Sequence, residues 1–220
     1  MQGWSALILA AGAGRRFGAN TSGGKLLADL AGAPVIRRTA EAVLRGGFAD
    51  VVVATGADHA GVANALGGLA CRIVPTPGWE EGMAASLRSG LAALAPDTAG
   101  VFVFLGDMPL VPVELCGALV DLAQSAGYAA RPTVSGKPGH PAGFTRAAFP
   151  DLARLTGDVG AATLLKTRSE GVVYLATEAT GAVLDIDSPA DLVAAARAWN
   201  ACATSATSDS AMSGGALPKP

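Results

Sequence analysis

The sequence predicts a three-layer α/β fold of the Rossmann-like type, with helices on both faces of a mostly parallel sheet. Short apolar runs alternate with helix-period segments along most of the chain. Half of the residues are hydrophobic and only 15% are charged, as in proteins with a compact core. The length of 220 residues suits one domain, which we assign to residues 1–202, followed by a flexible Ser/Ala/Gly-rich tail at 203–220.

Four continuous apolar runs predict strands that are covered on both faces. They are "WSALILA" at 4–10, "DVVVAT" at 50–55, "CRIVP" at 71–75 and "GVFVFLG" at 100–106. Helices are predicted between them at 34–46, which begins with Pro34 and ends at a Gly-Gly pair, and at 82–95. In the second helix Met83, Leu87, Leu91 and Leu94 fall on one face, which predicts that this face is buried.

The remaining third of the chain predicts two short extended pieces around a Gly/Pro turn between 127 and 144. Helices at 145–154 and 159–168 and strands at 172–175 and 183–186 follow. A closing helix begins at Pro189, with Ser188 as its N-cap. In such folds ligands bind beyond the carboxyl ends of the strands, so residues that follow the strands are the candidates for a site.

Charge and composition exclude several classes of partner. The formal net charge is -2 and no block of Lys and Arg is present, which argues against a nucleic-acid partner. No apolar segment approaches the ~20 residues of a membrane-spanning helix, and no basic leader precedes the first apolar run. The three cysteines are far apart and form no C-x-x-C pair, as in a reducing compartment. We therefore expect a cytoplasmic protein without membrane contact.

A glycine-rich loop follows the first predicted strand, in "ALILAAGAGRRFGANTSGGKLL". Glycine permits positive φ and lets backbone N–H groups approach a ligand. Arg15, Arg16 and Lys25 add positive charge at the same place. The loop therefore predicts a site for a di- or triphosphate, the alternative being a flexible connection with solvated charges. Its glycines stand at positions 12, 14, 18, 23 and 24.

Two common phosphate-binding loops do not match this segment. A Walker A loop needs four residues between its glycines and Ser or Thr after the lysine, whereas here five residues separate Gly18 from Gly24, and Leu26 follows Lys25. Gly12, Gly14 and Gly18 give only a G-x-G-x-x-x-G variant of the dinucleotide fingerprint. No Tyr-x-x-x-Lys pair is present, which argues against a short-chain dehydrogenase.

Several motifs in order resemble those of the MobA-like NTP transferase family, and most closely its molybdenum cofactor cytidylyltransferases. They are "LILAAGAGRRFG" with "KLL", "TPGWEEGMAASLRSGL", "FLGDMP", "GHPAGF", "LTGDVGAATLL" and "DIDSPADL", and they cover roughly residues 5–195. The resemblance implies a nucleotidyltransferase fold, CTP and Mg²⁺, transfer of CMP to the phosphate of molybdopterin cofactor, and release of pyrophosphate. A molybdoenzyme or its maturation chaperone is implied as a further partner.

Two carboxylates are the candidates for metal ligands. Asp107 directly follows the strand at 100–106, so it should emerge where a nucleotide binds, although a turn aspartate could also cap the next helix. Asp185 and Asp187 stand two apart and would share one face of a strand. The resemblance favours Asp187 as the second ligand, with capping of the closing helix as its alternative role.

The resemblance also assigns roles to the residues of the other motifs. Lys25, Arg16 and Asp107 are implied to be catalytic, and His140 and Asp158 to contact the acceptor. For His140 the alternative is a loop histidine bonded to backbone, and for Asp158 an N-cap. The residues implied to bind the nucleotide are Leu9, Ala10, Ala11, Gly12, Gly14, Arg15, Arg16, Lys25, Gly82, Ser86 and Gly106.

Short stretches of the sequence indicate which nucleotide base is expected and where the chain departs from the family pattern. The cytidine branch has "LAAG" where the guanosine branch tends to have "LAGG", and residues 9–12 read "LAAG", so CTP is expected and GTP is the alternative. The "ANTSGG" segment lengthens the distance from Gly18 to Lys25. Ala162 stands where relatives commonly have Arg, so one cation near the acceptor is missing.

Other functions remain open at this point. Within the same fold, the acceptor could be a sugar phosphate or another phosphorylated metabolite. The chain could also bind a nucleotide and deliver cofactor without turnover. A nicotinamide-dependent dehydrogenase is a third alternative.

Overall fold

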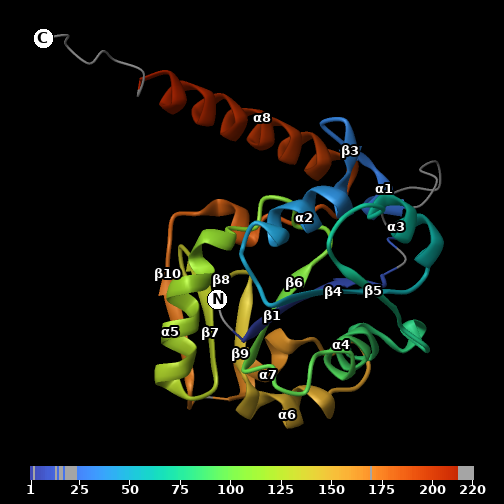
Figure 1. Cartoon of the computed structure of the whole chain (residues 1–220), viewed down its shortest axis with the longest axis vertical. Helices are drawn as coiled ribbons and strands as arrows, with labels where there is room; N and C mark the ends of the chain where they lie inside the picture. The colour runs from blue at the N-terminus through green and yellow to red at the C-terminus, as the bar shows by residue number, and fades with distance from the viewer. Residues whose placement is uncertain (2, 13, 15–16, 18–23, 169, 213–220) are drawn as a thin grey trace, which may run out of the picture.

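The computed structural model describes residues 1, 3–12, 14, 17, 24–168 and 170–212, with side chains described up to residue 201. Residues 213–220 of the predicted tail therefore lie outside the described part. Figure 1 shows helices on both sides of a central sheet. The strands are β1 (Trp4–Ala10), β2 (Asp29–Leu30), β3 (Ala33–Pro34), β4 (Asp50–Thr55), β5 (Arg72–Pro75), β6 (Gly100–Leu105), β7 (Ala129–Val134), β8 (Lys137–Pro138), β9 (Ala142–Thr145) and β10 (Val172–Ala176).

The helices alternate with the strands, as the sequence predicts. They are α1 (Gly24–Leu27), α2 (Val35–Leu44), α3 (His59–Ala65), α4 (Met83–Ala92), α5 (Cys116–Ala126), α6 (Phe149–Ala153), α7 (Ala161–Thr167) and α8 (Pro189–Met212). Single 3₁₀ turns lie at Trp79–Glu81, Val113–Leu115, Arg146–Ala148 and Thr180–Val183. Helices α3 and α5 are not among the predicted elements. Among the described residues, none of these helices combines the length and apolar character needed to traverse a bilayer.

The central sheet is mostly parallel, which confirms the predicted fold class. Its strand order is β10-β7-β9-β6-β1-β4-β5, with β8 paired to β7. Strand β1 pairs in parallel with β4 and β6, and only β9 and the short β8 pair antiparallel with their neighbours in this sheet. The carboxyl ends of β1, β4 and β6 therefore meet at one edge, where the loops that follow them come together.

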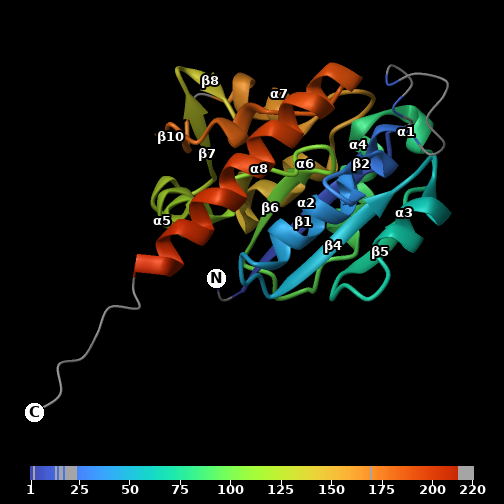
Figure 2. The same ribbon diagram turned by 90° about the horizontal axis from the view of Figure 1, so that it is seen from above.

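Two apolar layers sandwich the sheet. In one layer, Ile36 of α2, Val62 of α3 and Leu119 of α5 pack against one face of β1 and β6. The other contains Leu87 of α4 and Leu152 of α6 with the opposite face. Figure 2, seen from above, shows α2 and α8 on one side of the strands. Because both faces are covered, the strands read as continuous apolar runs, as the sequence predicts.

One expectation about the C-terminal part is wrong. The predicted strand at 183–186 is a 3₁₀ helix, Thr180–Val183, followed by residues without regular structure. Ala182 and Ile186 are nevertheless fully buried, so the apolar residues that predict a strand here reflect burial and not strand pairing. The tail predicted from residue 203 overlaps α8, which continues to Met212, and its flexibility stays a prediction. The assignment of residues 1–202 to a single domain stays a prediction.

The 3₁₀ helix Thr180–Val183 is held by close backbone contacts. The N–H of His140 donates to the carbonyl of Ala182 at 2.7 Å, and a Cβ on Gly139 would lie 2.6 Å from that same oxygen. A Cβ on Gly181 would overlap the carbonyl oxygen of Leu110. These contacts fix the direction in which the chain runs from β10 toward Asp187.

Replacing Gly181 with alanine is expected to lower the free energy of unfolding by about 1–3 kcal/mol, because backbone has to move to admit the methyl group. The matched control is Gly117→Ala in α5, where no described heavy atom lies within 4 Å of the added Cβ. That control should be neutral or gain up to ~1 kcal/mol from helix propensity. Urea unfolding followed by circular dichroism measures both, and equal stabilities of the two variants would contradict the packing argument.

Candidate active site

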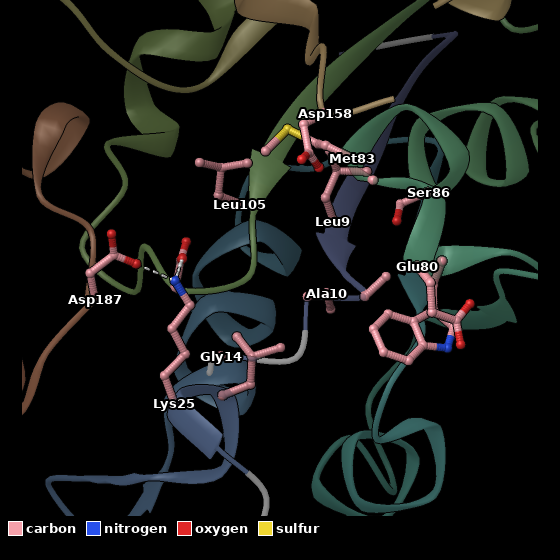
Figure 3. Close-up of a pocket in the computed structure, with 16 residues that line it drawn as sticks. Leu9, Ala10, Gly14, Lys25, Glu80, Met83, Ser86, Leu105, Asp158 and Asp187 are labelled. Atoms are coloured by element: carbon pink, nitrogen blue, oxygen red, sulfur yellow. Dashed lines mark hydrogen bonds and ion pairs between the residues drawn. The ribbon is translucent and has the colours of Figure 1, made fainter. Parts of the chain in front are cut away.

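A cavity lies at the carboxyl edge of the sheet, where β1 and β6 end. Its volume is about 520 Å³. Figure 3 shows Lys25 and Asp187 pointing toward one another on one wall and Ser86 and Glu80 on another. The lining residues are Leu9, Ala10, Ala11, Gly12, Gly14, Lys25, Leu26, Trp79, Glu80, Gly82, Met83, Ser86, Leu105, Asp107, Asp158 and Asp187.

The polar centre of the cavity is the ammonium group of Lys25. Lys25 forms ion pairs with Asp107 and, at 2.6 Å between Nζ and Oδ1, with Asp187. The side chains of Lys25 and Asp107 are 16% and 15% exposed, and that of Asp187 is 44% exposed. Three segments that are far apart in the sequence thus meet at one cation, as a shared polyanion site requires.

The pKa values of Lys25 and Asp107 both lie above their usual values. Burial by itself would lower the pKa of Lys25, but the nearby Asp107 and Asp187 carboxylates outweigh it, and the pKa lies above its usual value. Burial raises the pKa of Asp107, and the charge of Lys25 offsets only part of that rise. Lys25 is therefore charged at pH 7 and stabilises the ionised form of a buried carboxylate.

The carboxylates have the chemistry of a divalent-cation site. Oδ1 of Asp107 is buried and accepts no hydrogen bond from the described residues. Asp187 contacts the same ammonium group, so oxygens of both carboxylates lie within reach of one ion. The described residues contain no group of three or more His, Cys, Asp or Glu side chains that would enclose a metal. Mg²⁺ typically uses one or two carboxylates together with phosphate oxygens and water, which this pair fits.

The loop after β1 approaches the cavity through its backbone. Gly14 has a φ of +57°, and a Cβ there would lie 3.2 Å from the backbone nitrogen of Lys25. Leu9, Ala10, Ala11, Gly12 and Gly14 all line the cavity, as the sequence predicts for this loop. Arg15 and Arg16, together with Gly18 and Gly23, lie outside the described residues, so their predicted contact with phosphate stays a prediction.

The end of β6 is fixed by hydrogen bonds to β1 and α2. The N–H of Gly106 donates to the carbonyl of Leu9 at 2.9 Å, and Thr39 Oγ1 donates to the carbonyl of Gly106 at 2.9 Å. The N–H of Ile186 donates to the carbonyl of Asp107, which brings the segment with Asp187 alongside. Gly106 itself is not among the lining residues, so its position suits alignment of Asp107 better than direct contact with a nucleotide.

The start of α4 forms the opposite wall together with the 157–160 segment. Gly82 has a φ of +114°, and a Cβ there would lie 2.5 Å from Oδ1 of Asp158. The N–H of Ala84 donates to the carbonyl of Gly157 at 3.1 Å. The predicted site residues Gly82, Ser86 and Asp158 all line the cavity. Close packing therefore joins the segment implied for the nucleotide to the segment implied for the acceptor.

His140 is not among the residues that line this cavity. Its Nδ1 lies 3.4 Å from the carbonyl oxygen of Val103, and the ring is half-buried. Burial, followed by the charge of Arg131, lowers the pKa of His140 to about 4, so the ring is neutral at pH 7. His140 therefore does not share the lining of this cavity with Asp158, and its contact with the acceptor stays a prediction.

Several lining residues are not among the predicted site residues. Met83 is predicted to face the core, but its side chain is 42% exposed and lines the cavity. Trp79 and Glu80 belong to the motif that supplies Gly82, so their position directly before that glycine is a signal in the sequence. Leu26 and Leu105 read as core residues, and nothing in the sequence distinguishes them from other buried leucines.

Residues 6–172 match the family described as MobA-like NTP transferase domain. The chain belongs to this family. The match spans the glycine-rich loop, Asp107 and the segment that carries Asp158, and of the residues that line the cavity only Asp187 lies beyond it.

Two relatives of this MobA-like chain carry different names. Nicotine blue oxidoreductase from Paenarthrobacter nicotinovorans is 31% identical over 189 residues, which cover 81% of this chain and 90% of that protein. Bifunctional protein GlmU from Rhizorhabdus wittichii is 36% identical over 121 residues, which cover 55% of this chain. The match spans only 26% of the length of GlmU.

Solved structures of similar proteins share the fold over nearly the whole chain. An Rv0371c homologue from Mycobacterium sp. strain JC1 is 27% identical with a TM-score of 0.77, covering 89% of this chain and 98% of that one. Rv0371c from Mycobacterium tuberculosis H37Rv in complex with manganese is 26% identical with a TM-score of 0.71, covering 88% and 98%.

Replacing Lys25 with methionine is expected to lower the free energy of unfolding of this MobA-like domain by about 3 kcal/mol at neutral pH, because a buried carboxylate loses its partner. Without Lys25 the pKa of Asp107 rises further above its usual value. Between that usual value and the raised one, the folded state binds more protons than the unfolded state, so stability falls as the pH rises. The loss should therefore be smaller at about pH 5 than at about pH 7.5.

Chemical denaturation at the two pH values measures this dependence. The matched control is Lys166→Met on α7, an exposed lysine whose removal should change stability by less than about 0.5 kcal/mol. The double variant Lys25→Met/Asp107→Asn should recover part of the loss, since it no longer buries an unpaired charge. Equal losses for Lys25→Met and Lys166→Met at both pH values would exclude a stabilising role for the Lys25 ion pairs.

Proposed function

We propose that this protein transfers CMP from CTP to the phosphate of molybdopterin cofactor and releases pyrophosphate. The observation that carries the proposal is the meeting of Lys25 and Asp107, both in the MobA-like NTP transferase domain, with Asp187, which follows that domain in the chain. The motif "LAAG" at residues 9–12 supports CTP over GTP. Other phosphorylated acceptors, such as a sugar phosphate, would suit the same site.

The reaction needs positioning and charge neutralisation more than proton transfer. A phosphate monoester has a second pKa of about 6, so the acceptor is mostly ionised at neutral pH and needs no strong general base. An oxygen of that phosphate attacks the α-phosphorus of CTP, and the bond to pyrophosphate breaks. The ammonium group of Lys25 would stabilise the negative charge of the transferred phosphate group, as cations do in phosphoryl-transfer sites.

Asp107 and Asp187 are the proposed ligands of a divalent cation, for which we favour Mg²⁺. The manganese complex of Rv0371c supports a divalent ion in this fold. When bound, such an ion would neutralise phosphate charge during transfer. Lys25 already contacts both carboxylates, so the triphosphate would have to draw its ammonium group toward the ligand for a cation to take the carboxylate oxygens.

A second candidate function is an oxidoreductase. The 31% identity with nicotine blue oxidoreductase over 90% of that protein favours it. Against it, no Tyr-x-x-x-Lys pair is present, and the cavity joins a lysine to two carboxylates. An enzyme of this kind would consume NADH or NADPH, and it would not release pyrophosphate.

The deciding experiment is pyrophosphate release from CTP with purified molybdenum cofactor and Mg²⁺. We expect release that requires both the metal and the cofactor, with CTP used at least about tenfold more efficiently than GTP. A panel of sugar phosphates is the control for the acceptor. Faster turnover of GTP would overturn the choice of base. Tight CTP binding without pyrophosphate release would favour a non-catalytic carrier that delivers the cofactor.

Replacing Asp107 with asparagine is expected to lower kcat/KM for nucleotidyl transfer by about 100-fold or more, because it removes a charged ligand from the proposed cation site. Binding of Mn²⁺ to the enzyme with CTP, followed by electron paramagnetic resonance, should weaken in parallel. The matched control is Asp121→Asn on the exposed side of α5. Wild-type turnover by Asp107→Asn at limiting metal would refute the metal assignment.

A further inference from the structure

Arg131 in β7 is a buried cation without an anionic partner. Its side chain is only 4% exposed. Nε and Nη2 both donate to the carbonyl oxygen of Gly139, at 3.0 and 2.7 Å. Across the described residues, no aspartate or glutamate forms an ion pair with Arg131. Since buried charges in proteins are normally paired, one neutral carbonyl leaves the charge of Arg131 uncompensated.

The register of the sheet brings Arg131 to the same face as the cavity. Val103 of β6 pairs with Ala142 of β9, and Ala130 of β7 pairs with Gly143 of β9. Continuing this register, Arg131 stands level with Ala142 and Val103, and level residues on neighbouring strands share a face. Leu105, two residues further along β6, points to that face as well and lines the cavity.

The guanidinium group extends from this level toward the carboxyl edge of β6. Its acceptor, Gly139, directly precedes His140, and His140 contacts the carbonyl of Val103. Arg131 therefore ends beside the motif "GHPAGF", whose strand β9 pairs with β6, the strand that carries Leu105 of the cavity. His140 is neutral at pH 7 because burial and then the charge of Arg131 lower its pKa to about 4, so it adds no second positive charge beside Arg131.

The register partner of Arg131 on β10 is Tyr174, which carries no carboxylate. Among the described residues, Asp151 accepts from Tyr128 and pairs with Arg154 and Arg168, and it forms no ion pair with Arg131.

We propose that Arg131 forms an oxyanion subsite for the acceptor molecule, in which its guanidinium binds an anionic oxygen group remote from the phosphate that receives CMP. The inference rests on the proposed function for the identity of the acceptor, but not for the existence of the anion site. A guanidinium fork matches the geometry of phosphate-like and carboxylate oxygens, and burial strengthens such an interaction.

The two histidines of the chain make the test direct. His140 lies beside Arg131. Nδ1 of His59 lies 2.7 Å from Thr55 Oγ1 at the end of β4, the strand that neighbours β1 and its glycine-rich loop. Imidazole ¹⁵N nuclear magnetic resonance of the full chain, titrated with inorganic phosphate, follows both rings at once. We expect a saturable shift of the His140 signals in the wild-type protein.

The variants separate charge from structure. Arg131→Met should weaken the His140 response by about tenfold or more, with the His59 response unchanged. Arg131→Lys keeps a charge and one donor for Gly139 and should give an intermediate affinity, and it serves if Arg131→Met does not fold. A wild-type titration in which only His59 responds would overturn the proposal, because phosphate would then bind the nucleotide loop alone.

Kinetics connect the subsite to the acceptor. Arg131→Met should raise the KM for the molybdenum cofactor by about tenfold and leave the KM for CTP unchanged. If the cofactor is not the acceptor, no turnover is seen in any variant, while the phosphate titration still tests the site. An unchanged KM for the cofactor in an active Arg131→Met enzyme would exclude the role in acceptor binding.

Discussion

The contact of Lys25 with Asp107 and Asp187 is the interaction on which the proposed site depends. Lys25 follows β1, Asp107 follows β6, and Asp187 precedes α8, so that 162 residues separate the first from the last. One ammonium group faces two carboxylates, which leaves the group with a net negative charge. Oδ1 of Asp107 remains buried without a hydrogen bond from the described residues. The arrangement is therefore poised to accept a further cation, at a desolvation cost that the Lys25 charge partly offsets.

Much of the structure around this contact serves to hold its three segments in register. The N–H of Gly106 bonds to the end of β1, and the N–H of Ile186 bonds to the carbonyl of Asp107. Ala182, which accepts from the N–H of His140, anchors the chain just before Ile186. The backbone of "GHPAGF" thus supports the path toward Asp187, and the imidazole of His140 packs against β6. The motif "GHPAGF", which the family resemblance implies to contact the acceptor, therefore also has a structural role.

The cavity has a wall that carries the Lys25 ion pairs and a wall of mixed polar and apolar side chains. Lys25, Asp107 and Asp187 lie on the first, and Met83 and Trp79 add apolar surface to the second, where Glu80, Ser86 and Asp158 also lie. Gly82 packs against the 157–160 segment so closely that no side chain fits between them. The relatives named as an oxidoreductase and as GlmU indicate that this scaffold carries different chemistries. Residues that line the cavity, more than the fold, must decide the substrate.

The sequence by itself determined the alternation of strands and helices, the mostly parallel sheet and the family, because apolar periodicity and ordered motifs are local properties. It also singled out most of the cavity residues, from Leu9 to Asp158. It could not determine that Asp187 follows a 3₁₀ helix and not a strand, since burial of Ala182 and Ile186 produces the same alternation. Only the tertiary structure decided that Met83 faces the cavity, that His140 stands apart from it, and that Arg131 is buried without a carboxylate. The physical reason is that pairing, burial and charge compensation depend on neighbours brought from distant parts of the chain.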